Sequence, residues 1–99
     1  MTVVTPLHAH FSPSHLTHVI SMMRQLGPPK IRAYFDEHSG AWFAQEGTHR
    51  LRAALILDLA PVMVFVHWPR SRAALERARY AAVERGLIFK RVEIFEGLS

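Results

Sequence analysis

The chain has 99 residues, of which 49% are hydrophobic and 20% are charged, and its formal net charge is +4. This length supports one hydrophobic core rather than two, and the composition is unlike that of disordered chains, so we expect one folded domain over residues 1–99. The chain has no cysteine, which excludes disulfides, thiolate metal sites and cysteine nucleophiles.

The N-terminal residues do not have the pattern of an export signal. They lack a basic start followed by a long apolar run, and no apolar stretch elsewhere reaches the length of a bilayer span. We therefore expect a cytoplasmic protein with no membrane partner. Residues 3–11 instead alternate apolar and polar side chains, which predicts a half-buried strand, and Pro6 favours an edge position for it.

A helix and a hairpin are predicted next. The Ser-Pro pair at residues 12–13 forms an N-cap and a first-turn proline, and apolar residues follow at helical spacing until Gly-Pro-Pro at residues 27–29 ends the helix. Alternation over residues 30–35 and apolar residues at 41–44 flank a polar turn. This pattern predicts a β-hairpin.

Two helices and two strands are expected after the hairpin. They span residues 48–59 (helix), 62–66 (strand), 71–86 (helix) and 88–95 (strand). The run at 62–66 is continuously apolar, which is typical of a central strand covered on both faces. In the last helix, Leu75, Ala78 and Ala82 are expected to face the core. The predicted fold class is therefore α/β (α+β), a small mixed sheet of about five strands with three helices packed on it.

The turn between the hairpin and the following helix is the candidate binding site. The first N–H groups of a helix have no partner within it and carry partial positive charge, so a helix start can hold a phosphate or carboxylate. Cations near a helix start oppose its dipole, a local cost that a bound polyanion offsets. The alternative is that Glu46 pairs with Arg50 or Arg52 and the glycine only makes the turn. The candidate ligand-binding residues are Gly47, Thr48, His49, Arg50 and Arg52.

Residues 42–54, followed by residues 61–66, resemble the core of the ParB/sulfiredoxin superfamily. Its members have a hairpin strand, then Gly-x-His-Arg or Gly-Glu-Arg-Arg, a helix with small residues and an apolar strand, and the resemblance extends over residues 3–67. It implies a ParB/sulfiredoxin-like fold with a phosphate cradle at residues 47–50. The implied ligand is ATP, as in sulfiredoxin-like members, or CTP, as in ParB-like members, and a divalent metal can accompany the nucleotide.

The chain also departs from that superfamily. Sulfiredoxins have their reactive cysteine at the position of Thr48, so their sulfinic-acid reductase activity is excluded here. Chromosome-partitioning ParB proteins need a helix-turn-helix domain and a dimerisation segment, for which 99 residues leave no room. Free-standing members include small-molecule kinases and ParB-like nucleases. If this chain is such an enzyme, the candidate catalytic residues are Glu46 as the base and His49, which with Arg50 stabilises the transferred phosphoryl group.

Three functional hypotheses follow from these residues. The first is a domain that binds a nucleotide or phosphate ligand at residues 47–52 in a DNA-associated setting. The second is a nonenzymatic interaction module, of a type encoded by phages or mobile elements, that docks on DNA or on an acidic protein, for which the positive net charge is suitable. The third is a ParB-like nuclease or small-molecule kinase.

Other residues that often carry chemistry have plainer interpretations here. His8 with His10, and His15 with His18, have spacings that suit a divalent metal, but the pattern supplies no further ligands, so we predict exposed imidazoles and no metal site. Trp68 either stacks on a base or, as is more usual for tryptophan, covers the core. The arginines of the last helix are expected on a solvated face, partly balanced by glutamates.

Overall fold

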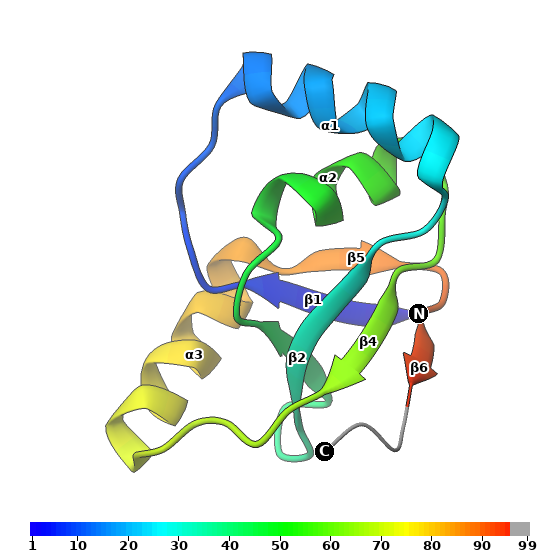
Figure 1. The fold of residues 1–99 in the computed structure, drawn as a ribbon. Helices are drawn as coiled ribbons and strands as arrows, with labels where there is room; N and C mark the ends of the chain where they lie inside the picture. The colour runs from blue at the N-terminus through cyan, green and yellow to red at the C-terminus, as the bar shows by residue number, and fades with distance from the viewer. Residues whose placement is uncertain (96–99) are drawn as a thin grey trace.

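The computed structural model describes residues 1–95, which form three helices and one six-stranded sheet (Figure 1). The elements in chain order are β1 (Thr2–Pro6), α1 (Pro13–Leu26), β2 (Lys30–Asp36), β3 (Ala41–Ala44), α2 (Thr48–Ile56), β4 (Val62–Phe65), α3 (Arg72–Arg85), β5 (Leu87–Phe89) and β6 (Glu93–Phe95). The strands lie in the order β5-β1-β3-β2-β4-β6. The predicted fold class is confirmed, with six strands in place of about five.

The sheet is mixed and curled. Three pairs are parallel (β1 with β3, β2 with β4, β4 with β6), and two are antiparallel (β2 with β3, β1 with β5). β5 and β6 lie at opposite edges of the sheet, yet only residues 90–92 join them. A connection this short spans on the order of 14 Å at most. The sheet must therefore curl until its two edges approach, as Figure 1 shows.

Two strand predictions were wrong, because strand limits depend on pairing with distant segments. The strand expected at residues 88–95 is two strands, β5 and β6, on different edges. The strand expected at residues 3–11 ends at Pro6, and it is internal because β1 pairs with both β3 and β5. Pro6 is tolerated because the pairing with β5 stops at Val4, so no partner on that side needs an N–H from the proline.

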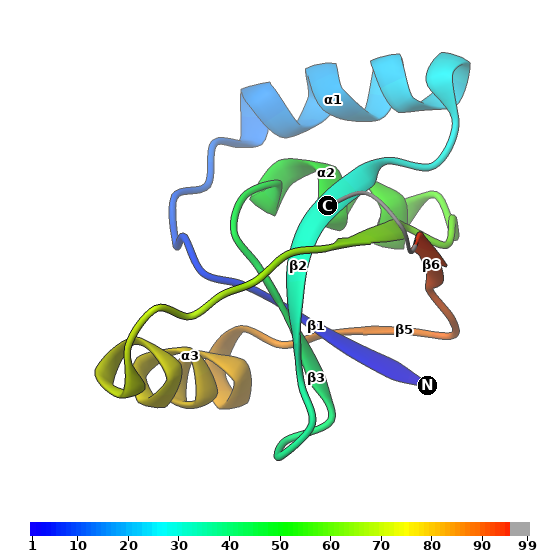
Figure 2. The same ribbon diagram turned by 60° about the horizontal axis from the view of Figure 1, so that its bottom comes forward.

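Helices cover both faces of the sheet (Figures 1 and 2). α2 packs on one face and α1 packs on α2, and the fully buried Leu51 belongs to the core of this side. α3 lies on the opposite face, against β1 and β3. There it packs on Phe43 through the three residues predicted to face the core, Leu75, Ala78 and Ala82.

β4 and α2 differ from the expectation. β4 is not fully covered on both faces, since Met63 is buried but Val62 and Val64 are only half-buried. The reason is that α3 lies against β1 and β3 rather than over β4. α2 ends at Ile56 instead of near residue 59, and Asp58 has a left-handed φ of 55°, which is incompatible with a continuing helix.

Candidate anion site at the start of helix α2

Gly47 begins α2 in a conformation that other residues rarely adopt. Its φ is 93° and its ψ is 26°, and a Cβ added there would lie 2.8 Å from Cδ1 of Ile31. The helix start has no side-chain cap. The first hydrogen bond of the helix runs from Leu51 N to the Gly47 carbonyl, 2.8 Å. The N–H groups of residues 48–50 come before this bond and therefore have no acceptor within the helix.

A pocket of about 460 Å³ lies over this helix start. It is lined by Glu46 and residues 47–50, all of which were predicted site residues. The β1–α1 loop adds His8 and His10, and the first turns of α1 add His15 and Val19. A hollow of about 600 Å³ beside α3 is larger, but none of the predicted site residues lines it. The fold thus brings every predicted site residue except Arg52 to one pocket.

His49 holds the β1–α1 loop against α2. Its Nε2 accepts a hydrogen bond from Ser12 N at 2.9 Å, and its ring stacks on Phe11 with the centroids 5.8 Å apart. An imidazole nitrogen that accepts a hydrogen bond carries no proton, so this ring is neutral with its proton on Nδ1. Burial lowers the pKa of His49 below 6.5, and the nearby His15, His10 and Arg52 lower it further.

Thr48 and Arg50 also bind neighbouring segments. The Thr48 hydroxyl donates to the carbonyl of His8 at 3.0 Å, and Arg50 Nη1 donates to the carbonyl of Lys30 at 3.0 Å. Arg50 Nη2 lies 3.7 Å from Glu46 Oε1, with 39% of the arginine side chain and 61% of the glutamate side chain exposed. The Glu46–Arg50 pair expected under the alternative interpretation therefore forms, but it is solvated and leaves the pocket open.

Arg52 lies outside the pocket. Its guanidinium is 4.9 Å from the centroid of the Phe11 ring, a cation–π contact on the loop that His49 also holds. Its buried Nε has no hydrogen-bond partner among residues 1–95. That Arg52 contacts a ligand stays a prediction, and in this structure its head group lies over the Phe11 ring.

Three histidines of the pocket, His8, His10 and His15, were not among the predicted site residues. His8, His10 and His15 are exposed, as predicted, but the fold carries them over the start of α2, where the His15 ring lies 4.6 Å from the His49 ring. The signal in the sequence was the density of histidines around the start of the first predicted helix, at positions 8, 10, 15 and 18. Within residues 1–95, no group of three or more histidine or acidic residues is arranged to hold a metal ion.

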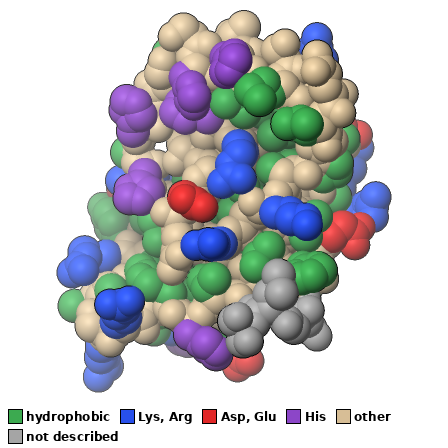
Figure 3. Space-filling model, in the orientation of Figure 1, with side chains coloured by type: hydrophobic (Ala, Val, Ile, Leu, Met, Phe, Trp, Pro, Cys, Tyr) green, Lys and Arg blue, Asp and Glu red, His purple; other side chains and the backbone are tan. Residues whose placement is uncertain are grey.

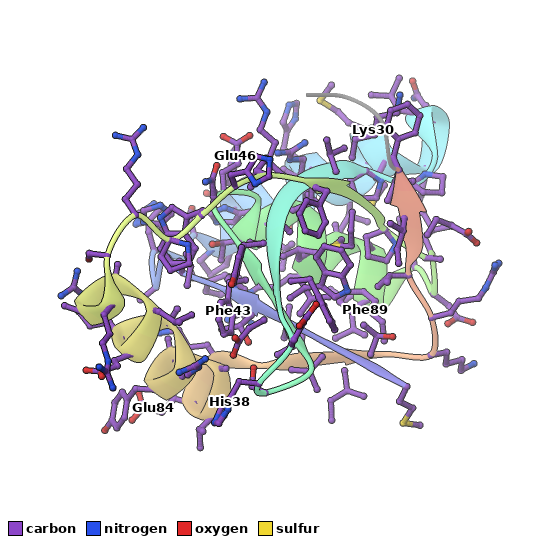
Figure 4. The ribbon with its side chains drawn as sticks, turned by 90° about the horizontal axis from the view of Figure 1, so that it is seen from below. Lys30, His38, Phe43, Glu46, Glu84 and Phe89 are labelled. Atoms are coloured by element: carbon purple, nitrogen blue, oxygen red, sulfur yellow. The ribbon has the colours of Figure 1, made fainter. Side chains whose placement is uncertain are left out.

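Other predicted features lie away from this site. Trp68 is half-buried and makes edge-to-face contacts with Tyr34 and Phe43, so it covers the core beneath α3. Arg79, expected on a solvated face, instead pairs with the buried Asp36. Figure 4 places Glu46 and Lys30 on one side of the molecule and His38 on the other.

Comparisons of this chain with protein-family models, with curated proteins and with solved structures find no match. The similarity of residues 42–66 to the ParB/sulfiredoxin superfamily therefore stays a prediction. In the part of the chain that the structure describes, no helix is long and apolar enough to cross a membrane.

Proposed function

We propose that this chain binds the phosphate group of a nucleotide, or of a similar ligand, in the pocket over the start of α2. The observation that carries the proposal is an uncapped helix start that opens into a pocket of about 460 Å³ flanked by Arg50 and imidazoles. The amides of residues 48–50 and the helix dipole favour an anion there. Gly47 has no side chain that would cover them.

Arg50 is the side chain best placed to contact the phosphate. Its exposed contact with Glu46 contributes roughly 0 to 1 kcal/mol, as solvated ion pairs do. A charge-assisted hydrogen bond to a phosphate oxygen contributes about 1.5 to 3 kcal/mol. A phosphate therefore competes successfully with Glu46 for the guanidinium, and the bond from Arg50 to the Lys30 carbonyl keeps the side chain beside the pocket.

The resemblance to the ParB/sulfiredoxin superfamily suggests ATP or CTP as the ligand, a divalent metal bound with the nucleotide, and a DNA-associated role in the cytoplasm. Binding is favoured over catalysis by the state of His49. Its Nε2 is engaged by Ser12 N and so is not available to donate a proton to a reacting phosphoryl group. Glu46, exposed at the pocket, stays the candidate base of a kinase-like reaction.

Calorimetric titration with ATP, CTP, their diphosphates and inorganic phosphate tests the proposal. We expect at least one of them to bind, and Arg50→Ala to weaken that binding by roughly 10- to 100-fold. Arg72→Ala is the matched control, because Arg72 is an exposed arginine that also pairs with a glutamate, but on α3. Absence of binding to all of these anions contradicts the proposal, and a single protein partner captured without nucleotide supports the interaction-module hypothesis in its place.

A further inference from the structure

No helix among residues 1–95 covers the outward face of β2, β4 and β6. α3 packs against β1 and β3, and α1 and α2 lie on the other face of the sheet. Strand pairing places two rows of side chains across the uncovered face: Lys30–Val62–Glu93 and Arg32–Val64–Phe95. We call the surface made by these two rows the open face. Figure 3 views the molecule from this side, and Lys and Arg side chains lie near the middle of the picture.

The side chains of the open face are accessible. Ile31 and Met63, which alternate with them along β2 and β4, are fully buried, so these strands direct the two rows outward. Lys30 and Arg32 are exposed, and Phe95 is 40% exposed. The valines of β4 are half-buried between the two outer strands and form an apolar floor.

The charge of the open face is positive and unbalanced. Neither Lys30 nor Arg32 forms an ion pair with another residue in the part of the chain that the structure describes. Glu93, and Glu46 on the same side of the molecule as Lys30 (Figure 4), each pair with an arginine of their own. The open face therefore favours a partner with negative charge.

An aromatic ring lies beside these cations. Lys30 Nζ is 5.7 Å from the centroid of the Phe95 ring, so the two side chains meet across β4. Both are in contact with solvent. A phosphate group competes with the ring for the ammonium, and the exposed ring then offers its face to a planar group.

Three kinds of anionic partner differ in how well they fit this arrangement. An acidic polypeptide supplies carboxylates for the cations but no planar group that must stack on the ring. A duplex supplies phosphates, but its base faces are stacked on one another. A single strand supplies phosphates together with bases whose faces are free to stack on an aromatic side chain.

We propose that the open face binds single-stranded nucleic acid, with Lys30 and Arg32 at the phosphates and Phe95 stacked on a base. The inference gives the DNA-associated role of the proposed function a surface and a strand state. It uses none of the residues that line the pocket over α2, so it does not depend on nucleotide binding there.

Fluorescence anisotropy with a labelled oligothymidylate of about 12 nucleotides tests the proposal. The competing probes are a DNA duplex of the same length and polyglutamate, and the salt concentration is varied from about 50 to about 200 mM. We expect the single strand to bind at least about tenfold more tightly than either competitor at low salt. Equal or tighter binding of the duplex or of polyglutamate overturns the proposal, as does absence of binding by the single strand.

Removal of the two cations separates the open face from the net charge of the chain. Lys30→Gln/Arg32→Gln should weaken oligothymidylate binding by at least about tenfold and lower the slope of log affinity against log salt by about 1.4, since each phosphate contact on a single strand contributes about 0.7. The matched control is Arg72→Gln/Arg77→Gln, which removes the same charge from exposed positions of α3. It should keep most of the affinity, and an equal loss in both double variants overturns the proposal.

Replacement of Phe95 tests the stacking contact. Phe95→Ala should weaken binding by about fivefold or more with an unchanged salt slope, because the ring holds a base and not a phosphate. Phe95→Tyr keeps an aromatic face and should keep the affinity. The exposure of this side chain favours retention of the fold in both variants, which circular dichroism checks. Unchanged affinity in Phe95→Ala overturns the assignment of the ring to a base.

Discussion

Two arginine–carboxylate pairs in this chain differ in geometry and in solvent exposure. Arg79 binds Asp36 through two hydrogen bonds of 3.0 and 3.1 Å, and only 3% of the Asp36 side chain is exposed. Arg50 faces Glu46 across one contact of 3.7 Å, and both side chains are substantially exposed. The first pair joins the hairpin to α3 and belongs to the fold. The second contributes little to the fold because it is solvated, and under the proposed function a ligand replaces its carboxylate.

The starts of the three helices differ in whether a side chain caps them. Ser12 Oγ accepts from His15 N at 3.4 Å at the start of α1, and Ser71 Oγ accepts from Ala74 N at 3.2 Å at the start of α3. α2 starts at Gly47 without a side-chain cap. A serine N-cap stabilises a helix by a few tenths of a kcal/mol more than a glycine at the same position. The start of α2 therefore forgoes stability that the other two helices gain.

Removal of each carboxylate in turn should give the largest difference in stability between the two pairs. Asp36→Ala leaves Arg79 without its buried partner, and we expect the free energy of unfolding to fall by about 3 kcal/mol. Glu46→Ala should change it by no more than about 0.5 kcal/mol, because Glu46 is solvated. Urea unfolding of both variants measures the difference, and equal losses would mean that the Glu46 pair is structural after all.

Substitution of two glycines tests whether the start of α2 is sterically restricted. Gly47→Ala combines a positive φ with a Cβ 2.8 Å from Ile31, and we expect a loss of about 2 to 3 kcal/mol in the free energy of unfolding. Gly40→Ala has a similar φ, 70°, but open space around the Cβ, so it should cost about 1 kcal/mol. If urea unfolding gives the same loss for both variants, Ile31 imposes no restriction on Gly47.

Acid should dissociate the structural pair. Hydrogen bonding from Arg79 lowers the pKa of Asp36 from 3.8 to about 2. The unfolded chain therefore binds a proton at higher pH than the folded chain, and about 2 kcal/mol of stability that is present above pH 3.8 should be lost as the pH falls to 2. Thermal unfolding between pH 5 and 2 measures this loss. Asp36→Asn should lack this contribution, and an unchanged pH profile in that variant would refute the assignment.

Mild acid should lower the stability of the fold through His49, at the start of α2. Its lowered pKa means that below pH 6.5 the unfolded chain takes up a proton that the folded chain does not, so stability should decline as the pH falls from 7 toward 5. His49→Gln retains an acceptor for Ser12 N but does not titrate, so its stability should decline less. Chemical unfolding at pH 7, 6 and 5 compares the two proteins. A parallel decline in both would assign the effect to other groups.

Local sequence patterns predicted the helices and turns whose ends are set by neighbouring residues. The Ser-Pro start and the glycine after Leu26 delimit α1, and the turn at residues 37–40 joins β2 and β3 as expected. The end of β1 at Pro6 and the division of the last strand depend on which strands pair across the sheet, which alternation alone does not specify.

The residues of the candidate site also fall into those that a local motif predicts and those that only the fold brings together. Gly47 and Arg50 were found from a contiguous motif, whereas His10 and His15 reach the pocket only because the β1–α1 loop folds over α2. Arg52 was assigned to the ligand by its nearness in sequence, and in the structure its guanidinium lies over the Phe11 ring, outside the pocket.

The central claim is that an anion binds at the start of α2, and backbone amide resonances in a titration with ATP, CTP or phosphate test it most directly. The account predicts that the largest shifts fall on the N–H groups of residues 48–50, while those of residues 72–74, at the serine-capped start of α3, stay in place. Shifts absent from residues 48–50, or centred on α3, would contradict it.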